Sequence, residues 1–194
     1  MDPFRLGPGM GDAPTGTAVD ESAVRWSALP GERSYELRAG DDRIGELRWA
    51  TRFGSLAEGD FGDRHLSLKR SGFLAPQVVI RDRASGAEVA RLHAHTTHSR
   101  LEIVGGGVYE LRRAGLLVPA WKLTTVDRAP VLNLEPVEER GRLEGGLVVV
   151  EPPYRSAPEL PVLLAASWYF IVLAWFEEVA VLAGDAVLRA ASDP

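Results

Sequence analysis

Three histidines come closest to a metal-ligand pattern in this sequence. His93, His95 and His98 lie in the segment LHAHTTHSR and are three of the four histidines in the chain. Alternate residues of a strand share a face, so His93 and His95 would point the same way and His98 would follow after a turn, as in strand-borne zinc sites. No acidic partner that would orient these imidazoles is evident, and a solvated hairpin explains the same residues. The sequence therefore predicts no metal site and no cofactor.

Patterns that would support catalysis are weak. Glu138 and Glu139, in the segment EPVEERGR, could divide acid and base roles, but the adjacent arginines and the lack of an apolar pocket favour a solvated loop. The glycines at 105–107 lie between two expected strands, which indicates a tight hairpin and not a phosphate-binding loop. No G-x-S-x-G, H-E-x-x-H or Walker pattern occurs. The sequence thus predicts a protein without enzymatic activity.

Composition narrows the classes of partner and the number of domains. A chain of 194 residues with a net charge of -5 is typical of one globular domain and argues against a nucleic-acid-binding protein. The absence of cysteine excludes disulfides, thiolate metal sites and palmitoylation. Residues 1–22 are rich in Gly, Pro, Asp and Thr and lack the pattern of a signal peptide, so we expect a disordered tail there. We expect a cytoplasmic monomer, peripheral at a membrane if it binds lipid.

Most of the chain shows the two-residue period of β-strands. Between Val24 and Glu151, short segments of alternating polarity, such as SYELRA and RIGELRW, are separated by turn residues. The segments number about twelve and recur about every ten residues, which is typical of a β-sandwich or a β-barrel.

The apolar run LPVLLAASWYFIVLAWF, from Leu160 to Phe176, contains no charged residue, and Glu177 and Glu178 follow it directly. A helix of about 17 residues rises about 25 Å, which is short of the roughly 30 Å of a bilayer's hydrocarbon core. Extending the helix to Leu182 would bury both glutamates in the bilayer, at a cost of several kcal/mol. A helix that is apolar on all sides is also expected where protein surrounds it completely.

The strand count and the apolar helix explain each other. A barrel of about eight strands is filled by its own side chains, whereas one of eleven strands can enclose a helix. We therefore predict a mainly β fold, a closed barrel of about twelve strands around a central apolar C-terminal α-helix, as a single domain over residues 23–190. The alternative is a tail-anchored membrane protein that uses residues 160–182 as its span.

The strand order, with YELRAGDDRIGELRW, GGGVYELRR, WKLTTVDRAPVLNLEP and the final apolar run, resembles the tubby-like superfamily. Within it, the chain is most similar to LURP-one-related and phospholipid-scramblase-like proteins, over about residues 24–185. The resemblance implies a twelve-stranded barrel closed around a C-terminal helix and a tendency to bind lipid headgroups. The acidic calcium-binding segment of the scramblases has no counterpart in EPPYRSAPEL, so calcium-dependent scrambling is not implied.

Up-and-down strands predict where charge gathers, because the odd-numbered strands then all end at the same rim. That rim would collect the basic residues Arg48, Arg52, Lys69, Arg70, Arg112 and Arg113, with His93, His95 and Arg100 between them. The opposite rim would collect the acidic residues Asp41, Asp42, Asp82 and Asp127. The helix would leave at the basic rim and bring Glu177 and Glu178 among the arginines. Either the glutamates neutralise that rim and hold the helix end, or the surplus cations bind an anion.

The residues that would bind such an anion are Lys69, Arg70, Arg112 and Arg113. We therefore expect a non-enzymatic binding module for anionic phospholipid headgroups or other small anions. The alternative is a protein-interaction or scaffold domain, because a net negative charge gives no general attraction to anionic membranes.

Overall fold

A computed structural model describes residues 23–31, 33–51, 54–72, 76–94, 98–115 and 120–192 of the chain, with side chains described between Val24 and Ala180. The tail expected at residues 1–22 lies outside the described residues.

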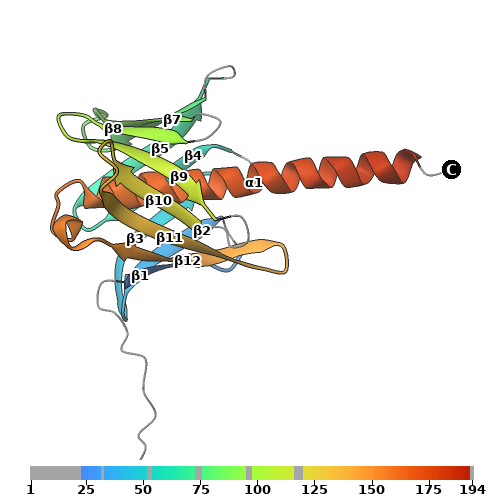
Figure 1. Ribbon diagram of the computed structural model, residues 1–194, viewed down its shortest axis with the longest axis horizontal. Coiled ribbons are helices and arrows are strands. Elements are labelled where there is room, and N and C mark those ends of the chain that lie inside the picture. The colour runs from blue at the N-terminus through green and yellow to red at the C-terminus, as the bar shows by residue number, and fades with distance from the viewer. Residues whose placement is uncertain are drawn as a thin grey trace, which may run out of the picture.

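Twelve antiparallel strands form one closed barrel (Figure 1). Each strand pairs with its neighbours in sequence, and β1 closes the barrel by pairing with β12. The strands are β1 (Ala23–Ala28), β2 (Ser34–Ala39), β3 (Asp42–Trp49), β4 (Leu56–Phe61), β5 (Arg64–Ser71), β6 (Gln77–Asp82), β7 (Glu88–Ala94), β8 (Ser99–Ile103), β9 (Val108–Ala114), β10 (Ala120–Thr125), β11 (Pro130–Glu139) and β12 (Arg142–Val150). The predicted closed barrel is confirmed, and closure leaves it without an unpaired sheet edge.

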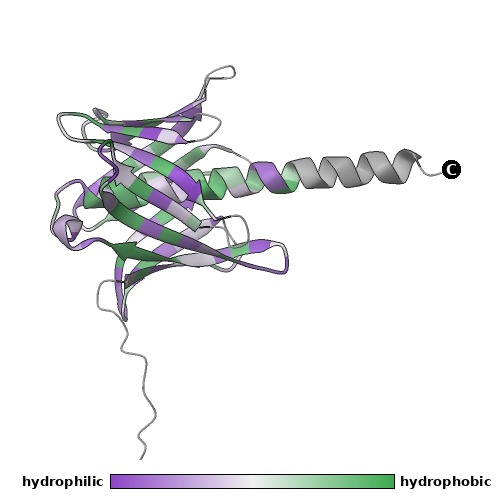
Figure 2. Cartoon of the chain, viewed as in Figure 1, coloured by the Kyte–Doolittle hydropathy of each residue, from purple (hydrophilic) through white to green (hydrophobic). Residues whose placement is uncertain are grey.

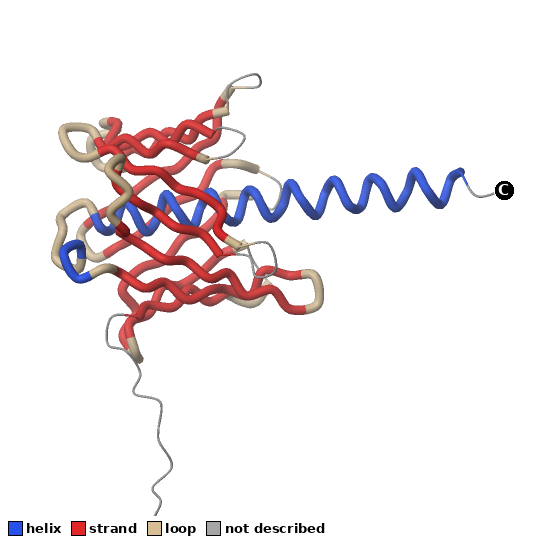
Figure 3. Tube along the Cα trace, viewed as in Figure 1, coloured by secondary structure: helices blue, strands red, loops and turns tan. Residues whose placement is uncertain are grey.

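One helix passes through the barrel. After β12 come a short 3-10 helix, η1 (Pro152–Tyr154), and then α1 (Leu160–Ser192). Figures 1 and 3 show α1 running inside the ring of strands and continuing beyond its far end. The helix is therefore longer than the barrel is deep, and it extends past the apolar run that ends at Phe176.

Alternating residues of the strands and the apolar helix build one core. Leu66, Leu68 and Leu92 on the strands, and Trp168 and Tyr169 on α1, are each completely buried. In Figure 2 the part of α1 inside the barrel is coloured hydrophobic, and a hydrophilic band follows where the helix leaves. The predicted role of the apolar run as the centre of the barrel is confirmed.

Stacked aromatic pairs join the helix to the strands. The Trp168 ring lies parallel to Trp26 at 5.5 Å between centroids, and Tyr169 lies parallel to Trp49 at 5.4 Å. Gly146 of β12 allows this approach, because a Cβ at that position would lie 2.9 Å from the Trp168 ring. Gly146 thus makes room for the Trp168 ring.

By length and composition alone, the segment Leu160–Ala180 could cross a membrane, and 61% of its 18-residue apolar window is buried inside the protein. Within this structure the segment serves as the barrel's core. The tail-anchored alternative would therefore require α1 to leave the barrel.

The odd-numbered strands end at one rim, which we call the helix-exit rim because α1 leaves the barrel there. The β11–β12 hairpin belongs to this rim, and it corrects one expectation. Glu138 and Glu139 lie in β11 and not in a loop, because Arg140 and Gly141 form a two-residue turn with φ angles of 52° and 72°. Such a turn matches the twist of the strands and lets the ladder run to its tip.

Candidate functional site

Two ion pairs hold α1 where it leaves the barrel. Arg70 near the end of β5 pairs with Glu177, and Arg113 near the end of β9 pairs with Glu178. All four side chains are more than one-third exposed, so each pair contributes on the order of 0.2–1 kcal/mol. The two glutamates therefore lie among the arginines of the helix-exit rim, as the sequence predicted.

Two aromatic residues hold the other sides of the same helix turn. Trp175 donates its indole N–H to Glu138 Oε2 at 3.2 Å. The Phe176 ring lies 3.9 Å from the guanidinium carbon of Arg33, which precedes β2. We call these four contacts, to β2, β5, β9 and β11, the helix-exit collar. Because the four strands are spread around the barrel, the collar holds the helix end from several sides of the rim.

The structure separates the four predicted anion ligands into two pairs. Leu68 and Leu111 are completely buried and face inward, so alternation directs Arg70 and Arg113 inward, to the helix, and their neighbours outward. Lys69 is exposed on the outer surface. Arg112, also outward, pairs with Glu110 at 2.6 Å. Lys69 and Arg112 therefore lie on a different surface from Arg70 and Arg113.

The predicted histidine candidates do not converge in the part of the chain that the structure describes. His93 lies on the outer face of β7, opposite Gln77 and Arg100 in the adjacent strands. His95 lies outside the described residues, and His98 precedes β8. Among the described residues, no group of three metal-ligating side chains is close enough to hold a metal ion.

The remaining basic residues predicted at this rim mostly serve the outer surface. Arg48 pairs with Glu46 at 2.7 Å, and Arg100 pairs with Glu102 at 2.9 Å. Arg52 lies outside the described residues.

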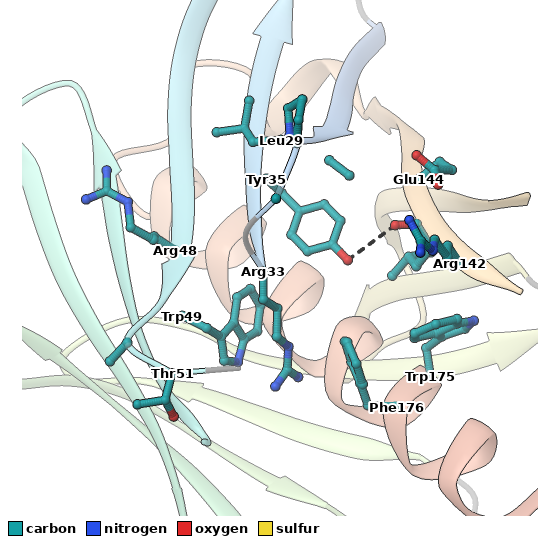
Figure 4. A pocket seen from close by; sticks show the side chains of 15 residues that line it. Leu29, Arg33, Tyr35, Arg48, Trp49, Thr51, Arg142, Glu144, Trp175 and Phe176 are labelled. Atoms are coloured by element: carbon teal, nitrogen blue, oxygen red, sulfur yellow. Dashed lines mark hydrogen bonds between the residues drawn. The ribbon is translucent and has the colours of Figure 1, made fainter. Parts of the chain in front are cut away.

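A cleft opens at the helix-exit rim, beside the collar. Its volume is about 970 Å³, and it lies between the β1–β2 turn, the end of β3, the start of β12 and α1 (Figure 4). We call it the exit cleft. Rings and aliphatic side chains form much of its wall: Leu29, Tyr35, Trp49, Leu143, Trp175 and Phe176. Such a concave, aromatic-walled space is typical of small-molecule sites.

Arg33 lies inside this cleft, between two aromatic rings. Its guanidinium carbon is 4.6 Å from the Trp49 ring centroid and 3.9 Å from that of Phe176, a double cation–π arrangement. Its Nη1 also donates to the Gly54 carbonyl at 3.1 Å. Burial lowers the pKa of Arg33 to about 10, because desolvation penalises the charged form. The side chain is still a cation at neutral pH.

The opposite wall of the cleft carries Arg142 and Glu144 of β12 (Figure 4). Both are exposed. No residue that the structure describes forms an ion pair with Arg142. Arg48 pairs with Glu46, and the Nε and Nη2 atoms of Arg33 are buried. The exposed charged side chains on this wall of the cleft are therefore those of Arg142 and Glu144.

No protein-family model, no curated protein and no solved structure matches this chain. The resemblance to the tubby-like superfamily stays a prediction.

Sequence analysis does not single out Arg33 or Arg142. Arg33 lies in no charged cluster, and Arg142 ends the charged segment EPVEERGR, which sequence analysis interprets as a solvated loop. The aromatic rings beside them come largely from other strands and from the helix. One partial signal exists in the segment AWFEE. If the two glutamates mark the helix exit, the preceding Trp175 and Phe176 must lie at the rim, where aromatic rings predict an interface or a ligand.

Proposed function

We propose that this protein is a non-enzymatic binding module for small anionic groups, such as the phosphate of a lipid headgroup, and that the exit cleft is its binding site. The observation that carries the proposal is the exposed guanidinium of Arg142 on one wall of the cleft, with the positive charge of Arg33 held behind it between the Trp49 and Phe176 rings. Guanidinium groups suit phosphate and carboxylate because their planar N–H groups match two oxygens at once.

Binding is favoured over catalysis by what lines the cleft. Glu144 is the single carboxylate among the described lining residues, and no histidine, serine or lysine is beside it to act as a base or nucleophile. The twelve-stranded barrel around a helix is also the architecture that a tubby-like, lipid-binding protein would have. We propose a monomer that works in the cytoplasm, peripheral at a membrane.

This proposal moves the anion away from the four side chains predicted from the sequence. Arg70, Arg113 and Arg112 already pair with carboxylates. An anion at any of these three arginines would have to displace a glutamate, whereas no described carboxylate pairs with Arg142.

Vesicle flotation tests the proposal. Neutral vesicles, and vesicles that contain phosphatidylserine or phosphoinositides, are mixed with the protein at two salt concentrations. We expect flotation with the anionic vesicles only, weaker at the higher salt, because exposed charges are screened.

Two matched variants locate the site. Arg142→Gln should reduce flotation several-fold, and Arg112→Gln, on the outer surface, should leave it unchanged. The reverse result would move the site to β9. If the wild-type protein binds neither vesicles nor soluble phosphate, the anion proposal is refuted and the protein-interaction alternative takes its place.

A further inference from the structure

We propose that the anion bound in the exit cleft also carries a primary ammonium group, so that Arg142 binds its phosphate and Glu144 binds its ammonium. The ligand class is that of the aminoalkyl phosphates, either free in solution or as the headgroup of a lipid. This inference rests on the proposed function, because it names the ligand class of the same site.

A separated pair of opposite charges on β12 carries the inference. Within the described strands, an arginine and a glutamate lie two residues apart at five places. At four of them the side chains form an ion pair with an N–O distance between 2.6 and 3.5 Å: Glu36 with Arg38, Glu46 with Arg48, Arg100 with Glu102 and Glu110 with Arg112. At the fifth place, Arg142 and Glu144 have their charged groups more than 4.0 Å apart and form no ion pair. Only in this fifth pair do both residues line the exit cleft.

A β-bulge in β12 explains why these two side chains stay apart. The register of β11 and β12 shifts by one residue here, which leaves Glu144 without a partner residue in β11. Such an extra residue bends its strand and changes the direction of the side chains around it. Gly145 stabilises the bulge, because its φ of 150° suits glycine and a Cβ would collide with the Trp26 carbonyl oxygen.

The neighbouring segments leave both charges open to the cleft. β1 pairs with β12 only as far as Gly145, so Arg142 and Glu144 lie beyond the end of that pairing. Both side chains are exposed, on the β12 side of the cleft (Figure 4). Glu139, opposite Arg142 in β11, pairs with Arg140 at 3.8 Å. A guanidinium and a carboxylate therefore face the same space, and neither has an ion-pair partner among the described residues.

A ligand with negative charge alone does not match this arrangement. A phosphate at Arg142 is repelled by Glu144, which is two residues or roughly 7 Å away along the strand. An ammonium group attached to the phosphate turns this repulsion into attraction, because its N–H groups donate to the carboxylate. The net charge of -5 acts in the same direction, since it opposes a pure anion more than a ligand that also carries a cation.

Matched soluble probes isolate the contribution of the ammonium group. Ethyl phosphate and O-phosphoethanolamine have the same chain length and differ by the ammonium; in phosphocholine, methyl groups replace the N–H donors. At pH 8 the phosphate of each monoester is doubly charged. Titration calorimetry measures the dissociation constants, and the indole N–H resonances of Trp175 in the cleft and Trp168 in the core report the location.

O-phosphoethanolamine should bind about three- to fivefold more tightly than ethyl phosphate, which is the contribution of an exposed ion pair. Phosphocholine should bind more weakly than O-phosphoethanolamine, because it cannot donate to Glu144. Binding should shift the Trp175 resonance and leave that of Trp168 in place.

Two variants test which side chain binds which group. Glu144→Gln should remove the preference for O-phosphoethanolamine without weakening ethyl phosphate, whereas Arg142→Gln should weaken both. Glu135→Gln is the control, because it removes the same charge at an exposed residue of β11 that is not part of the cleft wall.

Vesicles distinguish the two sources of the ligand. Phosphatidylserine and phosphatidylglycerol carry the same net charge, but only the first has an ammonium group. Flotation that favours phosphatidylserine, and that loses this preference in Glu144→Gln, supports a lipid headgroup. Tighter binding of O-phosphoethanolamine without that preference supports a free aminoalkyl phosphate.

The two proposals fail in different ways. If ethyl phosphate binds at least as tightly as O-phosphoethanolamine, or if Glu144→Gln keeps the preference, the ammonium group is refuted and the anion module stands. If neither soluble probe nor any anionic vesicle binds, both proposals are refuted. Binding that leaves the Trp175 resonance unmoved overturns the assignment to the exit cleft.

Discussion

Replacing Trp168 at the centre of the barrel tests the fold most sharply. Its side chain is completely buried, stacked on Trp26 at 5.5 Å and edge-on to Tyr35 at 5.6 Å. Trp168→Ala removes a whole buried indole, which costs about 3–5 kcal/mol. That is a large part of the 5–15 kcal/mol by which domains are typically stable. We expect a variant that is mostly unfolded or melts far below the wild type.

A second substitution at the same position separates volume from polarity. The Trp168 N–H is buried and has no acceptor among the described residues. Trp168→Phe keeps a ring and removes this unpaired donor, whose burial costs about 1–3 kcal/mol. The relief offsets part of the lost volume, so we expect a net change of about 1 kcal/mol or less.

Urea unfolding followed by far-ultraviolet circular dichroism measures both changes. The control is Phe170→Ala on the same helix. Phe170 is half-buried and contacts Trp121 edge-on at 5.7 Å, so its loss should cost about 2 kcal/mol or less. If Trp168→Ala and Phe170→Ala destabilise the protein equally, or the former by less than about 1 kcal/mol, the helix is not the core of the barrel.

Three further outcomes are expected. Leu164→Asp places a charge at a side chain that is 3% exposed, so it should abolish the whole cooperative transition, whereas a melt like the wild type's would contradict a central helix. Gly146→Val should cost about 1–3 kcal/mol, because its Cβ would meet the Glu135 carbonyl oxygen at 2.8 Å; an unchanged urea midpoint would show that β12 can move away from Trp168. The free energy of unfolding should fall between about pH 10 and 12, because burial raises the pKa of Tyr35, Tyr109 and Tyr169 to about 12 in the folded protein, so these tyrosines lose their protons first in the unfolded chain. The lowered pKa of Arg33 acts in the opposite direction, but it is one group against three. Urea midpoints at pH 8, 10 and 11 check this, and a constant midpoint would contradict it.

The barrel and the charges at its rims could be predicted from the sequence because they depend on the local alternation of polar and apolar residues. Alternation such as that of Leu66 and Leu68 shows which face of a strand is buried. Turn residues such as Gly40 and Gly105, both with positive φ, mark the hairpins. When every connection is a hairpin, the strand's number in the sequence tells at which rim it ends. This is why Glu177 and Glu178 could be placed beside arginines.

The sequence did not predict which side chains at the rim point inward and which point outward. Arg112 and Arg113 are adjacent in sequence and look equivalent, yet one pairs with Glu110 on the outer surface and the other with Glu178 on the helix. The inward direction of Leu111 settles the difference. That inference needs the register of β9 in the barrel, and a pair of adjacent arginines does not supply it.

The exit cleft escapes sequence analysis because closure of the barrel creates it. β1 pairs with β12, which brings the segment around Arg33 beside Arg142, more than a hundred residues later in the chain. The helix then adds Phe176 from a third region, so that Arg33 touches both the barrel wall and the helix that fills it. No local pattern encodes this meeting of three segments. The ring contacts of Arg33 therefore join the two parts of the structure whose association makes the core, the strands around the seam and the end of α1.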